Sequence, residues 1–134
     1  MVCCAALAAC GAKDAQTGKA NSIQLTRKLA EIAGQANQAA PADIDANTRL
    51  EGVRAGPGLR LTSTYTLVNS KSEGVDRTTF EARLVPTIKN ASCDNPELRQ
   101  LIDQGVVVVL EYRGEDGKPI GTVNIQRETC SASR

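Results

Sequence analysis

Hydrophobic positions along the chain change from a helical spacing to an alternating spacing near residue 48. Between residues 22 and 40 the apolar side chains recur at the spacing of one helix face: Leu25, Leu29, Ile32, Ala33 and Ala36. Ser22 can cap this segment and Pro41 ends it. The pattern therefore predicts an amphipathic helix at the start of the folded part of the chain.

Two alternating segments follow this helix. Residues 48–55 and 59–69 flank the turn at 56–58 and predict a β-hairpin. In the second arm the apolar side chains share one face and the polar ones the other: Leu59, Leu61, Tyr65 and Leu67 against Arg60, Thr62, Thr64 and Thr66. Such alternation is typical of a sheet with one covered face and one wetter face.

Helical spacing then returns twice before two further strands. Asp76 can cap a helix with an apolar stripe of Phe80, Leu84, Ile88 and Ala91, kinked or broken near Pro86. A second short helix starts at 94–96 and stops at Gly105. The apolar run at 106–112, the turn at 114–119 and residues 120–126 predict a central strand and its returning neighbour.

These elements predict an α+β fold in the order α-β-β-α-α-β-β. We expect a four-stranded, largely antiparallel sheet with the helices packed on it, in a single domain over residues 22–134. A domain of this size buries roughly two-thirds of the surface of its unfolded chain, which gives modest stability.

The N-terminus predicts export and lipidation. Residues 1–10 are apolar and small, as in a signal peptide, and Leu7-Ala8-Ala9-Cys10 resembles a bacterial lipobox. In proteins of that class the signal is cut before the cysteine, which then carries acyl chains and anchors the protein to a membrane. Gly11 follows Cys10, which by resemblance to sorted lipoproteins indicates the outer membrane, and residues 11–21 predict a flexible tether.

Two features leave alternatives open at this end. No basic residue precedes the apolar run, and the run is short, so we expect the true start to lie upstream of Met1 or the chain to be truncated. An ordinary buried helix start is the plainer interpretation. Cys3, Cys4 and Cys10 could also hold a metal, although they are not spaced as ligands that converge on one ion.

The cysteine count predicts one disulfide. Once the signal is removed and Cys10 is assigned to lipid, Cys93 and Cys130 remain. A pair of cysteines in an oxidising compartment is typical of a disulfide, with two buried free thiols as the alternative.

Composition argues against several function classes. The chain has no histidine, which removes the commonest general base and metal ligand, and no two carboxylates are placed for acid–base chemistry. Net charge is +1, and only Phe80, Tyr65 and Tyr112 are aromatic, so a nucleic-acid site is not indicated. We therefore expect no enzyme, no cofactor, no metal and no small-molecule substrate.

One strand indicates a binding surface. In the run from Val106, alternate residues face the predicted helices, which leaves Val107 and Val109 on the opposite face beside Arg60, Thr62 and Thr64. An exposed apolar patch with a polar rim is typical of a partner-binding face. The alternative is that the N-terminal helix covers this face and buries the strand completely.

Several short stretches together carry a resemblance that covers residues 45–130. They are Asp45-x-x-Thr48-Arg49-Leu50, Gly56-Pro57-Gly58, Tyr65-Thr66-Leu67-Val68-Asn69, Cys93-x-x-Pro96-x-Leu98, Gly105-Val106-Val107, Tyr112-Arg113, Gly117-Lys118-Pro119-Ile120-Gly121 and Cys130. This pattern resembles a broad family of small exported bacterial lipoproteins. The segment from Cys93 to Cys130 is more remotely similar to α/β-class type II secretion pilotins, outer-membrane lipoproteins that carry secretin subunits to that membrane.

The resemblance implies a fold and an address more than an activity. We expect a lipid-anchored outer-membrane protein, facing the periplasm, that binds an envelope protein and acts in assembly, with a secretin as the most concrete partner. The alternative is a periplasmic enzyme inhibitor or immunity-type protein, which would insert the turn at 56–58 or 114–119 into an active site.

Overall fold

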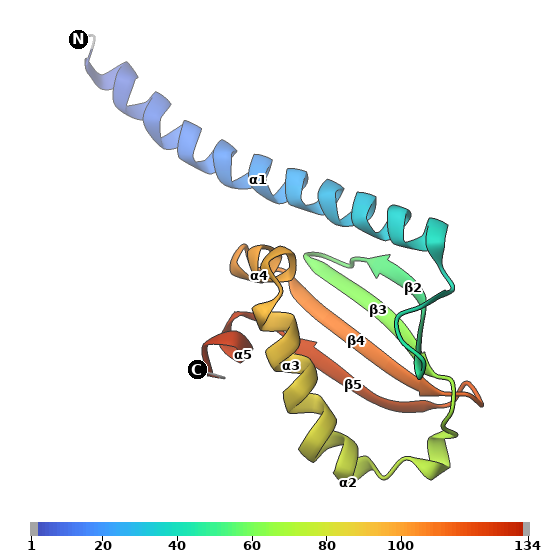
Figure 1. The fold of residues 1–134 in the computed structure, drawn as a ribbon. Helices are drawn as coiled ribbons and strands as arrows, with labels where there is room; N and C mark the ends of the chain where they lie inside the picture. The colour runs from blue at the N-terminus through green and yellow to red at the C-terminus, as the bar shows by residue number, and fades with distance from the viewer. Residues whose placement is uncertain (1–2, 133–134) are drawn as a thin grey trace.

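The protein folds as a five-stranded sheet with helices packed against it (Figure 1). This computed structural model describes the backbone of residues 3–132 and the side chains of residues 21–131. The strands lie in chain order across the sheet: β1 (Ala42–Asp43), β2 (Thr48–Ala55), β3 (Arg60–Leu67), β4 (Val107–Gly114) and β5 (Pro119–Ile125). All neighbours pair antiparallel except β3 and β4, which are parallel.

The α+β class and the two hairpins are confirmed, but the sheet differs from the prediction in two ways. It has five strands and not four, because β1 pairs two residues with Leu50 and Arg49. A strand of two residues is too short to show any alternation, so the sequence gives no sign of it. The sheet is also mixed. The helices between β3 and β4 return the chain to the same end of the sheet, which makes that central pair parallel.

The helices between β3 and β4 begin where their caps predict. Asp76 accepts hydrogen bonds from the Thr78 amide and the Thr79 hydroxyl, at 3.2 and 2.8 Å, and α2 (Arg77–Thr79) starts there. A π-helical segment, Phe80–Leu84, then leads into α3 (Val85–Asp94), so the irregularity predicted near Pro86 lies just before it. Asn95 caps α4 (Pro96–Asp103), and Gly105 ends that helix with a φ of 101°.

The N-terminal helix α1 (Cys3–Ala39) is longer than predicted, because it runs back through residues 11–21. Its side chains up to residue 20, including that of Cys10, lie outside the described residues. The division into signal, tether and domain stays a prediction. Near its other end, α1 seals the edge of the sheet: the Asn37 amide donates to the Val53 carbonyl and its Oδ1 accepts from the Val53 N–H, both at 2.8 Å.

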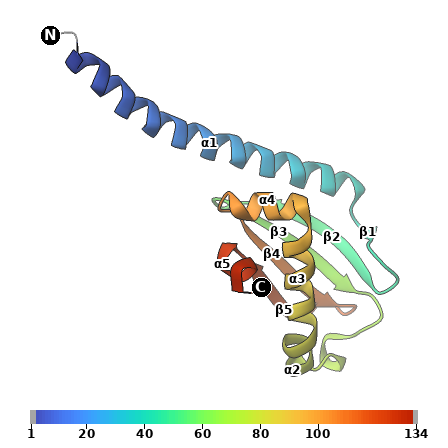
Figure 2. The ribbon, with the colours of Figure 1, turned by 60° about the vertical axis from the view of Figure 1, so that its left-hand side comes forward.

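All the described helices that contribute to the core do so from one side of the sheet. Figures 1 and 2 both show α3 and α4 against the sheet, with α1 running past α4. The core joins α1, α4 and the sheet through Leu25, Leu29, Leu101, Ile102, Leu61, Val106, Val108 and Ile125. We call the side that carries these residues the helix-covered face.

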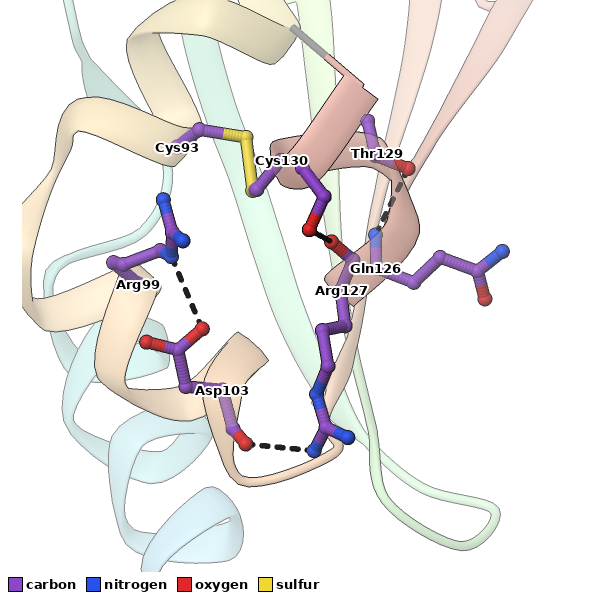
Figure 3. The surroundings of a disulfide bond; sticks show 8 residues. Cys93, Arg99, Asp103, Gln126, Arg127, Thr129 and Cys130 are labelled. Atoms are coloured by element: carbon purple, nitrogen blue, oxygen red, sulfur yellow. Dashed lines mark hydrogen bonds and ion pairs between the residues drawn. A yellow bond between two sulfur atoms is a disulfide. The ribbon is translucent and has the colours of Figure 1, made fainter. Parts of the chain in front are cut away.

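The predicted disulfide is present and closes the domain. Cys93 in α3 and Cys130 in α5 (Arg127–Ala132) are bonded with their Cα atoms 5.4 Å apart, and both are buried. Helix α5 was not predicted. Figure 3 shows how it is held: the Arg127 guanidinium donates to the Asp103 carbonyl at 2.7 Å, so α5 is tied to the end of α4 as well as to α3.

Candidate functional site

The helix-covered face is not completely covered, and an open groove of about 490 Å³ remains between helix and sheet. Its floor is formed by β3 and β4 and one wall by the helical segment from Phe80 to Ile88; the segment between β1 and β2 forms the other rim. We call it the tyrosine groove. It is lined by Ile44, Asp45, Thr48, Tyr65, Leu67, Phe80, Leu84, Ile88, Ala91, Ser92, Asn95, Leu98, Leu110 and Tyr112.

The aromatic floor follows from the strand pairing. In the parallel register of β3 and β4, Tyr65 lies opposite Tyr112, and their rings stack with centroids 5.2 Å apart. Phe80 meets Tyr112 edge-on at 5.7 Å, so the three aromatic side chains of the chain form one cluster. Gly121 on β5 makes room for Phe80, because a Cβ there would lie 2.5 Å from Phe80 Cε1.

The groove exposes apolar side chains on both rims. Leu84 is 43% exposed and Ile44 is 57% exposed; within the described residues the only other large hydrophobic side chain so exposed is Ile23, on α1. Two of these three therefore line the same groove. Exposed apolar side chains gathered around a concave surface are typical of a protein-binding site.

The floor of the groove is polar enough to orient a partner. Burial, and after it the nearby Tyr65 and the negative charge of Asp45, together raise the pKa of the Tyr112 hydroxyl to about 12. Burial also raises the pKa of Tyr65, against a hydrogen bond with Ser63. Both hydroxyls are therefore protonated at neutral pH and can donate hydrogen bonds to a docked chain.

The residues predicted as a binding face lie together, but on the opposite side of the sheet. Arg60 pairs with Val107 and Thr62 with Val109, and Thr64 follows on the same face. Thr62 and Val109 are buried, at 2% and 6% exposure, Val107 is half-buried and Arg60 is exposed. The apolar area that this face offers to a partner is small, and its role as a binding face stays a prediction.

The alternative, that α1 covers this opposite face, does not describe the structure. Leu25 and Leu29 of α1 belong to the core cluster that contains Leu61 and Leu101, on the helix-covered face. On the opposite face Arg54 lies across from Thr62, and its guanidinium pairs with Glu111 at 3.4 Å. The aliphatic stem of an arginine can cover small β-branched residues beside it while its charged head stays in water.

Sequence reasoning missed the tyrosine groove as a site. It assigned Tyr65, Leu67 and Tyr112 to a covered face and Leu84 to the stripe of a packed helix. The usable signal was the concentration of all three aromatic residues on elements that meet. Whether the helix covers them completely depends on its tilt, which the sequence does not show.

Within residues 3–132, no helix combines the length and the apolar character needed to span a membrane. Among the described side chains, no group of three potential ligands of the Cys, Asp or Glu type is gathered as a metal site requires.

Comparison with known proteins shows the fold. No protein-family model matches the chain, and no curated protein matches its sequence. A protein of Pseudomonas aeruginosa assigned as secreted superposes with a TM-score of 0.68 and 18% identity, over 81% of this chain and 95% of that one. The pilotin EpsS of the Vibrio vulnificus type 2 secretion system superposes with a TM-score of 0.67 and 15% identity, over 81% of this chain and 94% of that one.

The type II secretion system pilotin AspS from Vibrio cholerae is similar to the same extent, with a TM-score of 0.65 and 13% identity over 81% of this chain and 94% of that one. The remote similarity to pilotins expected from the sequence is therefore confirmed. At these identities the likeness is one of fold, and function has to be argued from the site.

Proposed function

We propose that this protein is a lipid-anchored, outer-membrane binding module without enzymatic activity, and that it holds a segment of an envelope protein in the tyrosine groove. A secretin subunit is the most concrete partner. The observation that carries the proposal is the open apolar groove with Leu84 and Ile44 exposed on its rims. The likeness in fold to two pilotins supports the choice of partner.

The groove suits a short amphipathic segment better than a flat protein surface. Its floor presents two tyrosines, and aromatic side chains are the commonest anchors of protein interfaces. A docked segment that covers Leu84 and Ile44 would gain about 1 kcal/mol from each, because roughly half of each side chain is still exposed. Helix-in-groove recognition uses this combination of concave shape and apolar lining.

Replacing Leu84 by aspartate should weaken partner binding at least tenfold, because docking would bury an unpaired carboxylate at the rim. Fold stability should change little, since Leu84 is 43% exposed. The measurement is co-purification and titration of the secretin subunit encoded with the type II secretion genes of the same bacterium. Ile23→Asp is the matched control, because Ile23 is an apolar residue that is 59% exposed and lies outside the groove. If Leu84→Asp binds the subunit as tightly as Ile23→Asp does, the groove is not the docking site.

Replacing Cys10 by alanine should move the protein from the membrane fraction to the soluble periplasmic fraction. The lipobox resemblance predicts that acyl chains on this cysteine hold the protein, and each buried CH₂ adds about 0.8 kcal/mol to membrane binding. Fractionation of cell envelopes after export checks this, with Cys4→Ala as the control. If the Cys10 variant stays with the outer membrane, lipid at this position is not the anchor.

A further inference from the structure

We infer that the segment that docks in the tyrosine groove carries a basic side chain, Lys or Arg, that pairs with Asp45. This inference rests on the proposed function, because it names the chemistry of the partner at that same groove. Among the described residues that line the groove, Asp45 is the only charged one. Every other lining side chain is apolar, aromatic or neutral.

Hydrogen bonds hold the backbone around Asp45 in a turn, so the carboxylate has a defined position. The amides of Ile44 and Asp45 both donate to the Thr48 carbonyl, at 2.9 and 3.3 Å, and close a turn between β1 and β2. Asp45 Oδ1 accepts from the Asn47 amide at 2.8 Å. The Asn69 side chain then clamps this turn from the next loop, donating to Asn47 Oδ1 at 2.7 Å and to the Ala46 carbonyl at 3.3 Å.

No cation of the described chain neutralises this carboxylate. Arg49, the nearest basic residue in the sequence, forms its ion pair with Glu51 at 2.8 Å. The ion pairs found within residues 21–131 join Arg49, Arg54, Arg99 and Arg113 to Glu51, Glu111 and Asp103, and none includes Asp45. Within residues 21–131, the hydrogen bond found at the Asp45 side chain comes from the Asn47 backbone amide, which leaves most of its acceptor capacity for a partner.

The charge of Asp45 acts on the groove and not only on solvent. Its negative charge contributes to the raised pKa of Tyr112, which lies in the groove floor. A docked neutral or acidic segment would strip water from Asp45 without replacing its hydrogen bonds, and this disfavours such segments. A basic side chain at the same place compensates the carboxylate.

The groove therefore has a direction. An adjoining hollow continues it past Asp45, lined by Asp45, Ala46, Asn47, Thr48, Leu67, Asn69, Ser70 and Leu84. Asn47, Asn69 and Ser70 lie with Asp45 around this hollow, whereas Leu98, Ile88 and Leu110, together with Ser92 and Asn95, line the part of the groove outside it. A segment with apolar residues followed by a basic residue fits in one orientation, with the basic residue at the Asp45 end.

Asp45 is exposed, so the pair should act on selectivity and association more than on total affinity. Exposed ion pairs change an equilibrium constant by about two- to fivefold, and salt screens them. Charges at the rim of an interface mainly set the association rate and its dependence on salt.

The test uses overlapping synthetic peptides that cover the secretin subunit, with binding kinetics measured on the full chain at about 20 and 150 mM salt. Asp45→Asn removes the charge and keeps the acceptor for the Asn47 amide, so the turn should survive. Asp43→Asn is the matched control. It removes the same charge two residues away from Asp45, and Asp43 itself does not line the groove. We expect about two- to fivefold slower association of the bound peptide for Asp45→Asn at low salt, almost no difference at high salt, and no change for Asp43→Asn.

A second pair of measurements identifies the partner group. Replacing the basic residue of the bound peptide by norleucine should slow its association with the wild-type protein by the same factor. The same replacement should cause no further loss in Asp45→Asn. Asp45→Lys should prefer the peptide with glutamate at that position. If a peptide binds and is lost in Leu84→Asp but is unaffected by Asp45→Asn at either salt concentration, the groove is the docking site and the inference about Asp45 is wrong. If no peptide binds, or Leu84→Asp has no effect, the proposed function fails first and takes this inference with it.

Discussion

Replacing Phe80 by alanine should lower the free energy of unfolding by about 3–5 kcal/mol, the range for large-to-small changes of aromatic core residues. Phe80 is 2% exposed and is the largest fully buried side chain among the described residues. It contacts Tyr112 edge-on and fills the space that Gly121 leaves on β5. The cavity that alanine would leave can therefore be filled only if both the helix and the sheet shift. Urea denaturation followed by circular dichroism measures the change.

The control for this prediction is Phe80→Leu, which keeps most of the apolar volume and should cost clearly less than alanine. A loss below 1 kcal/mol in Phe80→Ala would mean that the segment from Phe80 to Leu84 is not anchored by this side chain. The wall of the tyrosine groove would then need another explanation.

Removing the disulfide by replacing Cys93 and Cys130 together with alanine should lower the free energy of unfolding by about 4 kcal/mol. The bond joins residues 37 apart in sequence, and closing a loop of that length restricts the unfolded chain by about this amount in the chain-entropy model. Helix α5 should loosen first, because the disulfide ties it to α3 and its loss leaves the hydrogen bond from Arg127 to the Asp103 carbonyl to hold it against α4.

Denaturation of the double variant should match that of the wild-type protein under reducing conditions. Ser131→Ala is the control, an exposed position on the same helix that is not part of the bond. Unchanged stability in the double variant would show that packing around α3 and α5, and not the covalent link, holds the end of the domain.

The local parts of the fold could be predicted from the sequence because their signals are local. Asp76 and Asn95 each mark a helix start by their capping chemistry, and Gly105 marks a helix end. The hairpin of β2 and β3 follows from the turn at 56–58 and the alternation in its second arm, and the disulfide follows from counting cysteines. Each of these signals is contained within a few residues or in the composition.

The rest depends on contacts between distant segments. Strand β1 has only two residues, and the parallel pairing of β3 with β4 is decided by the path of the helices between them. The tyrosine groove needs the tilt of α3 relative to the sheet, because the same apolar stripe would be buried under a closer helix. The binding surface that the sequence predicts around Val107 lies on the other side of the sheet, where Thr62 and Val109 are buried and Arg60 is exposed, and its role stays a prediction.

The contact of Asn37 with Val53 sets how far this chain can be shortened before the border of β2 becomes exposed. The Asn37 side chain forms hydrogen bonds with both the N–H and the C=O of Val53, on the outer border of β2. Strand β1 covers this border only at Leu50 and Arg49. A shortened chain that begins after α1 leaves this border bare, and a bare strand border pairs readily with the same strand of another molecule. Soluble material for crystallisation or binding work should therefore keep α1 at least from residue 22 onward, even though no groove residue lies in it.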